Sequence, residues 1–191
     1  MFVSSCKDKP EEEKPQHWTV HAKVENAEEF SNVVEVRLMA GNTVLARSDF
    51  KDGSFTIELP EMVPQNYLRP FVTFTNLIPM RPPKSLLNNK NVKAAHGYLK
   101  GFDEDGNFVG DLLLIKSSND SQYVLYLGFF IYVDAFVTVL GSDRFSTYSI
   151  TARKGWNILY RTTNYDLETV DWSTTIPIDG MRWYILHRMF H

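Results

Sequence analysis

The stretch that decides the fold is residues 43–59, which read TVLARSDFKDGSFTIEL. Two runs rich in β-branched and aromatic residues, Thr43–Phe50 and Gly53–Leu59, flank Lys51-Asp52-Gly53. Asp-Gly between two such runs is a strong signal of a β-hairpin, because glycine tolerates the positive φ that the turn requires. The segment therefore predicts two antiparallel strands joined by a tight turn.

The same alternation of apolar and polar residues extends toward both ends of the chain. Trp18–Glu25 and Val34–Leu38 each place alternate apolar side chains on one face, which is typical of half-buried strands. A second Asp-Gly signal, at Asp105-Gly106, separates two further apolar runs. The other expected strands are 71–74, 98–102, 108–115, 147–152, 155–161 and 181–186. Without a sustained helical period, the sequence predicts an all-β protein, an antiparallel β-sandwich.

The most apolar stretch, residues 123–140, is interpreted as strands rather than as a transmembrane helix. Such a helix needs about 18 or more predominantly apolar residues, but Asp134 falls inside this span and Gly128 interrupts it. The β-branched and aromatic residues that dominate the span favour strands. We expect two consecutive central strands that turn at Asp134-Ala135.

Composition excludes several classes of function. The chain has 191 residues, of which 43% are hydrophobic, 23% charged and 14% aromatic. The formal net charge of −3 argues against nucleic-acid binding, which normally needs a basic excess. The single cysteine excludes an internal disulfide and a multi-cysteine zinc site.

That cysteine, Cys6, precedes a tether. Residues 7–16 are all charged, proline or glutamine, so they bury no apolar surface and should form a solvated linker. Val3-Ser4-Ser5-Cys6 resembles a bacterial lipobox, and the acidic run after it resembles the export signal of Bacteroidetes-type surface lipoproteins. The resemblance implies that Cys6 is acylated, for example with palmitate, and anchors the protein in the outer membrane of the cell envelope.

Only Met1 and Phe2 precede this motif. A complete signal peptide has a basic region and about 7–15 apolar residues, so the resemblance implies a longer start than the one printed. The alternative is that Cys6 is an incidental thiol in the tether.

Two further resemblances concern the body of the chain. Val34-Glu35-Val36-Arg37-Leu38 and Ser48–Ile57 with Leu59-Pro60 resemble the carboxypeptidase regulatory-like, transthyretin-type β-sandwich modules, which are commonly scaffolds and imply no catalytic residues. Residues 132–141, 152–160 and 174–184 resemble the closing half of uncharacterised Bacteroidetes lipoproteins. Because Pro79, Pro82 and Pro83 interrupt the strands, we expect a tether 1–16, a module 17–78, a connector 79–95 and a second module 96–191.

Candidate metal and catalytic sites are weak. Asp103-Glu104-Asp105-Gly106-Asn107 has its glycine too early for an EF-hand calcium loop and is interpreted as a hairpin tip. His17/His21 and His187/His191 are each four residues apart, about 13 Å in a strand, which is too far for one ion. Carboxylates at 134, 143, 166 and 168 could act as a hydrolase pair only if the fold joined them. We therefore expect no metal, no cofactor and no catalytic residue.

The candidate ligand-binding residues are aromatic. Trp156, Trp172, Trp183 and Tyr184 could form a platform that stacks on flat ligands such as sugar rings, whereas aromatic residues in strands more often pack the core. Trp172 differs from the others because it lies in the polar, loop-like stretch 164–178.

These observations lead to one expected function and two alternatives. We expect a non-enzymatic lipoprotein of the outer membrane that serves as a binding or assembly module, with a glycan or a protein as partner. The first alternative is a carrier of lipids or small apolar ligands, in which residues 123–140 line a β-barrel-like cavity. The second is an accessory of a glycan-directed hydrolase.

Overall fold

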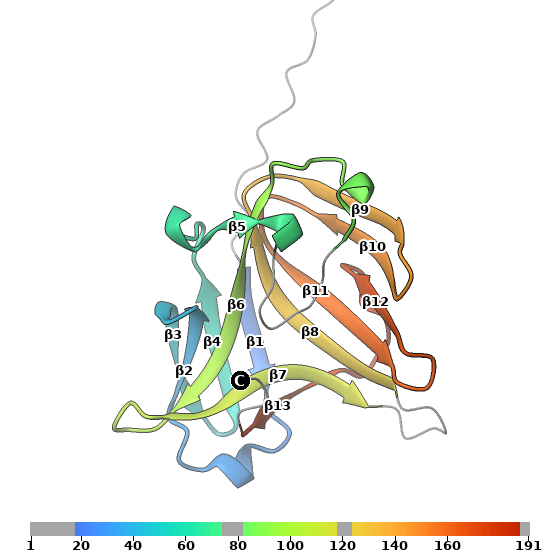
Figure 1. Ribbon diagram of the computed structural model, residues 1–191. Helices are drawn as coiled ribbons and strands as arrows, with labels where there is room; N and C mark the ends of the chain where they lie inside the picture. The colour runs from blue at the N-terminus through green and yellow to red at the C-terminus, as the bar shows by residue number, and fades with distance from the viewer. Residues whose placement is uncertain (1–17, 74–81, 118–123, 188–191) are drawn as a thin grey trace, which may run out of the picture.

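The computed structural model describes residues 18–73, 82–117 and 124–187 and confirms the all-β fold class (Figure 1). Strands make up 60% of the chain, and thirteen strands of the described part form one sheet that is not closed into a barrel. No helix in these ranges is long and apolar enough to cross a membrane. The strands are β1 (Trp18–Lys23), β2 (Glu35–Ala40), β3 (Thr43–Lys51), β4 (Ser54–Leu59), β5 (Arg69–Pro70), β6 (Lys93–Phe102), β7 (Phe108–Ser117), β8 (Val124–Val133), β9 (Val137–Ser142), β10 (Ser146–Ala152), β11 (Gly155–Asn164), β12 (Thr169–Ser173) and β13 (Arg182–Leu186). The 3₁₀ turns are η1 (Ala27–Phe30), η2 (Gln65–Tyr67), η3 (Phe71–Thr73) and η4 (Lys84–Leu86).

The predicted hairpin is present as β3 and β4. Phe50 pairs with Phe55, and the next pair leaves a two-residue turn at Asp52 and Gly53. Both turn residues have positive φ, 50° and 70°, as a type I′ turn requires. β1 then adds to β4, and β2 adds to β3, in an antiparallel order β1-β4-β3-β2.

The sheet continues into the second half of the chain through β6. Residues 98–102 of β6 pair with β2, so the predicted modules 17–78 and 96–191 are joined by direct strand pairing, and the boundary between them stays a prediction. At the other edge, Val24 forms a β-bridge with Trp183. The Asn26 side chain bonds both backbone polar groups of Ile185, at 2.8 and 2.9 Å, and so holds β13 beside the end of β1.

The apolar span 123–140 forms strands, as predicted. Its described part gives β8 and β9, separated by residues 134–136, which include the predicted turn at Asp134-Ala135. β8 is central, because it pairs with β6, β7 and β11. β9 pairs with β10 at the end of the sheet, so the expectation that both strands are central is wrong for β9.

Two other segments differ from the expected ones. Phe71–Thr73 is a 3₁₀ turn instead of a strand, since pairing with β6 ends at Pro70, after which the Phe71 N–H donates to the Val92 carbonyl at 2.9 Å; Phe74 lies outside the described residues. The stretch expected as a loop around Trp172 contains β12, which pairs with β11 on one side and in parallel with β10 on the other. Backbone pairing on both sides, rather than local hydrophobicity, makes this polar segment a strand.

Buried side chains form two clusters, which we call the first core and the second core. The first core gathers residues from β1, β2, β4, β6 and β13 around Trp156, and the second lies under β8–β12 around Trp172. β8 contributes to both, with Phe130 in the first core and Phe129 in the second, because alternate residues of a strand point to opposite faces. The two cores therefore meet at β8.

Candidate functional site

Strands β6, β7 and β8 meet in a three-way junction. The first half of β6 pairs with β8, its second half pairs with β7, and the second half of β7 pairs with the first half of β8. The pairs that border the junction are Gly97↔Phe130, Leu99↔Leu112 and Leu114↔Gly128. Each strand thus changes partner at its middle.

One residue of each strand lies between these bordering pairs: Tyr98, Leu113 and Phe129. In the described pairings, none of the three is matched across the junction. Each is paired on its outer side, with β2, β13 and β11 respectively. The three strands therefore leave an opening in the sheet.

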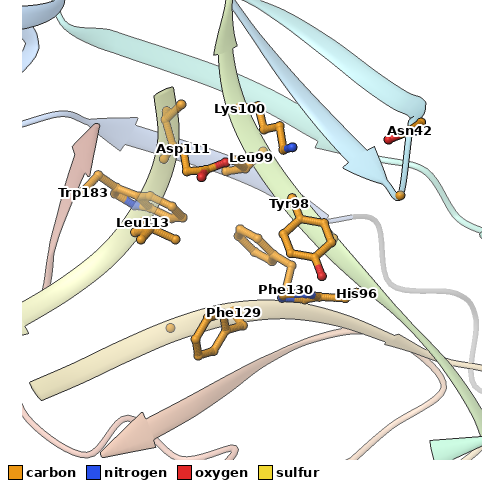
Figure 2. Close-up of a pocket in the computed structure, with 14 residues that line it drawn as sticks. Asn42, His96, Tyr98, Leu99, Lys100, Asp111, Leu113, Phe129, Phe130 and Trp183 are labelled. Atoms are coloured by element: carbon orange, nitrogen blue, oxygen red, sulfur yellow. The ribbon is translucent and has the colours of Figure 1, made fainter. Parts of the chain in front are cut away.

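A cavity of about 240 Å³ occupies this opening. Figure 2 shows the side chains of all three strands pointing into it, with Trp183 of β13 on one side. Phe130 and Trp183 stack there, with ring centroids 6.0 Å apart and planes 11° apart. The lining residues are Gly41, Asn42, His96, Gly97, Tyr98, Leu99, Lys100, Asp111, Leu112, Leu113, Gly128, Phe129, Phe130 and Trp183. Most of these are apolar.

Glycines make the close packing around the cavity possible. A Cβ on Gly97 would lie 2.7 Å from Cζ3 of Trp156, and a Cβ on Gly128 would lie 2.9 Å from Cδ2 of Leu114. Both distances are shorter than carbon atoms tolerate, so side chains from the core side approach the backbone where only glycine fits. Trp156 is held in this position by its Nε1–H, which donates to the Pro60 carbonyl at 2.7 Å.

His96 and Tyr98 supply two uncharged polar side chains to the lining. The His96 ring lies edge-on to Tyr98, with centroids 3.9 Å apart, and 5.6 Å from the Phe129 ring. Burial lowers the pKa of His96 to about 3, and burial together with the charge of Asp111 raises the pKa of Tyr98 to about 12. Near pH 7 both side chains are neutral and present hydrogen-bond donors and acceptors without charge.

Lys100 and Asp111 add one charge of each sign to the lining. The Lys100 amino group lies 5.2 Å from the Phe108 ring centroid and 6.0 Å from that of Tyr98. Together with His96 and Tyr98 they give the apolar cavity a small set of polar groups, which is the usual composition of a small-molecule site.

The four predicted aromatic residues do not form one platform. Trp156 is buried in the first core and Trp172 in the second, while Trp183 and Tyr184 are half-buried neighbours on β13. Trp183 alone of the four lines the cavity. Trp172 is 1% exposed, so it too packs a core, the more common role of aromatic residues in strands.

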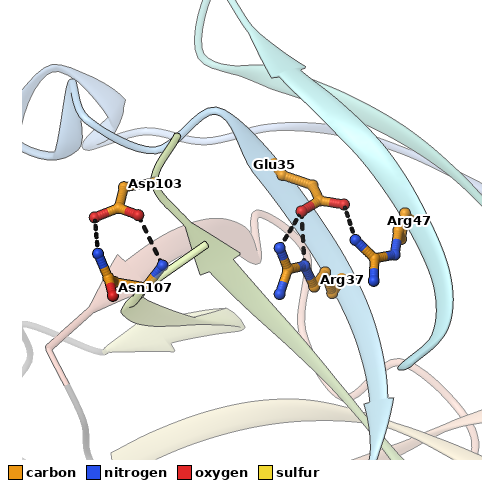
Figure 3. A network of polar contacts seen from close by, with 5 residues as sticks. All are labelled: Glu35, Arg37, Arg47, Asp103 and Asn107. Carbon is orange, nitrogen blue, oxygen red and sulfur yellow. Dashed lines mark hydrogen bonds and ion pairs between the residues drawn. The ribbon is translucent and has the colours of Figure 1, made fainter. Parts of the chain in front are cut away.

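The remaining candidates have local structural roles or lie outside the described residues. Cys6 lies outside them, as do His17 and His191. The Asp103 carboxylate accepts hydrogen bonds from the Asn107 backbone (2.7 Å) and side chain (3.1 Å), which close the hairpin tip (Figure 3). No group of three or more His, Cys, Asp or Glu within the described ranges could hold a metal ion.

Charged residues near β2 form a second polar network, also drawn in Figure 3. Glu35 accepts from Arg37 at 2.6 Å and from Arg47 at 3.1 Å. Burial alone would raise the pKa of Glu35, but the two guanidinium groups outweigh it and hold that pKa below its ordinary value. Arg37 also lies 3.9 Å from the Phe102 ring centroid. The network fixes the outer face of β2 and does not line the cavity.

Two of the predicted carboxylates, Asp134 and Asp143, also accept local structural hydrogen bonds. Asp134 accepts from the backbone N–H of Lys93 at 2.9 Å. Asp143 accepts from two backbone N–H groups and from the Tyr148 hydroxyl, each at 2.9 Å. Neither carboxylate lines the cavity.

Sequence reasoning missed His96, Tyr98 and the junction itself. One signal was present: isolated glycines inside strand-like runs, at 97 and 128, mark places where side chains or ligands approach the backbone closely. Comparison with protein-family models, with curated proteins and with solved structures finds no match to this chain.

Proposed function

We propose that this protein is a non-enzymatic binding module that holds a small, flat, largely apolar ligand in the cavity at the junction of β6, β7 and β8. The observation that carries the proposal is the cavity itself. It lies at a break in the sheet, and the three strands are paired with one another on each side of that break. A cavity of about 150 Å³ holds benzene. The volume of about 240 Å³ therefore suits a molecule of one or two rings.

The polar lining supports an uncharged ligand with a polar edge. Neutral His96 and Tyr98 offer hydrogen bonds, while the rings of Phe129, Phe130 and Trp183 offer stacking surfaces. This favours the small-ligand alternative over a glycan platform, since three of the four aromatic residues expected to form that platform do not line the cavity.

Calorimetric titration with indole as the probe tests this proposal. Leu113→Trp places a larger side chain in the cavity and should weaken indole binding at least tenfold. Leu140→Trp is the matched control, because Leu140 is 57% exposed on β9. Equal binding of indole by both variants and the unchanged protein, or no binding by any of them, would refute the proposal.

A second candidate, the binding of a protein or glycan partner, is favoured by exposed apolar residues on neighbouring turns. Phe145 lies in the β9–β10 turn, Tyr165 and Leu167 lie in the β11–β12 turn, and each is at least half exposed. The Phe145 carbonyl accepts from the Val170 N–H at 3.0 Å, so the two turns are adjacent. Phe145→Ser with Tyr165→Ser should abolish co-purification of a partner while leaving indole binding intact.

The proposed location is the outer membrane, through a lipid on Cys6. The support is the lipobox-like sequence and the charged tether behind it. When expressed behind a bacterial lipoprotein signal peptide, the protein should incorporate labelled palmitate and sediment with membranes, and Cys6→Ser should do neither. Labelling that persists in Cys6→Ser would refute the anchor.

A further inference from the structure

Three buried polar atoms on one face of β11 and β12 have no hydrogen-bond partner among the described residues: Arg161 Nε, Thr163 Oγ1 and Trp172 Nε1. Arg161 pairs directly with Trp172 across the two strands, and Thr163 is two residues further along β11. Residues two apart share a face of a strand. The three groups therefore point into the same side of the sheet.

All three groups can donate hydrogen bonds, and one is a cation. Thr163 is 7% exposed and Trp172 is 1% exposed. Burying their polar atoms without hydrogen bonds therefore lowers the stability of the folded state. The Arg161 guanidinium lies 5.7 Å from the Trp172 ring centroid, and no described carboxylate is within ion-pair distance of it. Burial lowers the pKa of Arg161, because desolvation disfavours the charged form.

We propose that Arg161, Thr163 and Trp172 form a binding site for an oxyanion, a carboxylate or a phosphate. The guanidinium supplies the charge, and an anion's oxygens accept from the three unpaired donors. The β8 residues paired with Arg161 and Thr163 are Leu127 and Leu125, so the anion lies beside an apolar surface. This site is independent of the cavity, although both lie along β8.

Indole N–H resonances in NMR spectra report on the site, and Trp172→Phe identifies the resonance of Trp172. The probes are sodium octanoate and sodium phosphate, titrated separately at constant ionic strength with sodium chloride. We expect one of them to shift the Trp172 resonance in a saturable manner. Saturation by octanoate alone assigns an anion with an apolar chain, and saturation by phosphate assigns the free inorganic ion.

Arg161→Gln should raise the dissociation constant of the anion about tenfold or more, since a charged hydrogen-bonding group is lost. Arg153→Gln is the matched control, because Arg153 is exposed in the turn between β10 and β11. Thr163→Val removes a donor with little change of volume and covers the case in which Arg161→Gln fails to fold. A lack of saturation with both probes would overturn the proposal, and so would equal dissociation constants for Arg161→Gln and Arg153→Gln. It would also be overturned if the cavity variant Leu113→Trp lost the response while Arg161→Gln kept it.

Discussion

Acid should weaken the fold through His96, whose ring is buried in its neutral form beside Tyr98 and Phe129. The pKa of His96 is about 3 in the folded protein, against an ordinary value of 6.5. Above pH 6.5 neither the folded nor the unfolded state binds the proton, so the histidine contributes nothing to the pH dependence. Between pH 6.5 and 3 only the unfolded state binds it, and stability falls as pH is lowered.

The size of the effect follows from the same two pKa values. The free energy of unfolding should fall by about 1.4 kcal/mol per pH unit across this window, or roughly 5 kcal/mol in all. This figure is an upper bound, because the remaining accessible surface of His96 faces the cavity, and water there solvates the imidazolium. Between pH 6.5 and 5 the loss should be at most about 2 kcal/mol, a large share of the stability of an ordinary domain.

Urea unfolding followed by tryptophan fluorescence at pH 7, 6 and 5 measures this loss. His96→Phe keeps a ring against Tyr98 and Phe129 but has no proton to bind, so it should show a shallower decline of stability than the unchanged protein. His21→Phe is the control, since that imidazole is exposed on β1. If the difference between the unchanged protein and His96→Phe stays constant from pH 7 to 5, the ring is solvated in the folded state and the reasoning fails.

Three further substitutions probe the packing around the two sites by urea unfolding. Gly97→Ala forces a methyl group against Trp156 and should cost about 1–3 kcal/mol, the usual cost of overpacking. Asn26→Ala leaves both backbone groups of buried Ile185 unpaired and should cost roughly 2 kcal/mol. Arg161→Met removes a half-buried cation whose buried Nε has no partner among the described residues and should stabilise the anion-free protein by about 1 kcal/mol.

Each of these substitutions has a counterpart that isolates its cause. Gly101→Ala meets the more yielding methyl groups of Val33 at 3.1 Å and should cost less than Gly97→Ala. Asn32→Ala and Arg153→Met alter exposed side chains and should change stability by less than 0.5 kcal/mol, within the usual range for surface sites (about ±0.5). A destabilising Arg161→Met would mean that the guanidinium is already paired in solution.

Most strands could be predicted because their signals are local. Asp52-Gly53 fixes a turn by the sign of φ, and the alternation around it fixes which faces are buried. The apolar run that became β8 was identified correctly because its β-branched and aromatic residues favour strands over a helix. Such features depend on neighbours in sequence, which a single chain displays directly.

The junction could not be predicted because it depends on register between distant strands. β6 changes partner from β8 to β7 within one residue, next to irregularities at Leu38/Met39 in β2 and at Gly101/Phe102 in β6. A shift of one residue turns every side chain to the opposite face. Sequence alone therefore identified Tyr98 as a strand residue, at the start of the expected strand 98–102, without indicating that it borders an opening.

The error at Trp172 has the same origin and leads to the anion site. Residues 169–173 read TVDWS, and their polarity favours a loop when judged alone. In the fold this segment lies between β10 and β11, so Trp172 is buried although its neighbours Asp171 and Ser173 are polar, and it faces Arg161 across the ladder. Polar groups that a strand carries into a core lower the stability of the fold unless they form hydrogen bonds there. The unpaired donors there are the observation on which the proposed anion site rests, and an Arg161→Met variant that gains stability but loses anion binding would support that site.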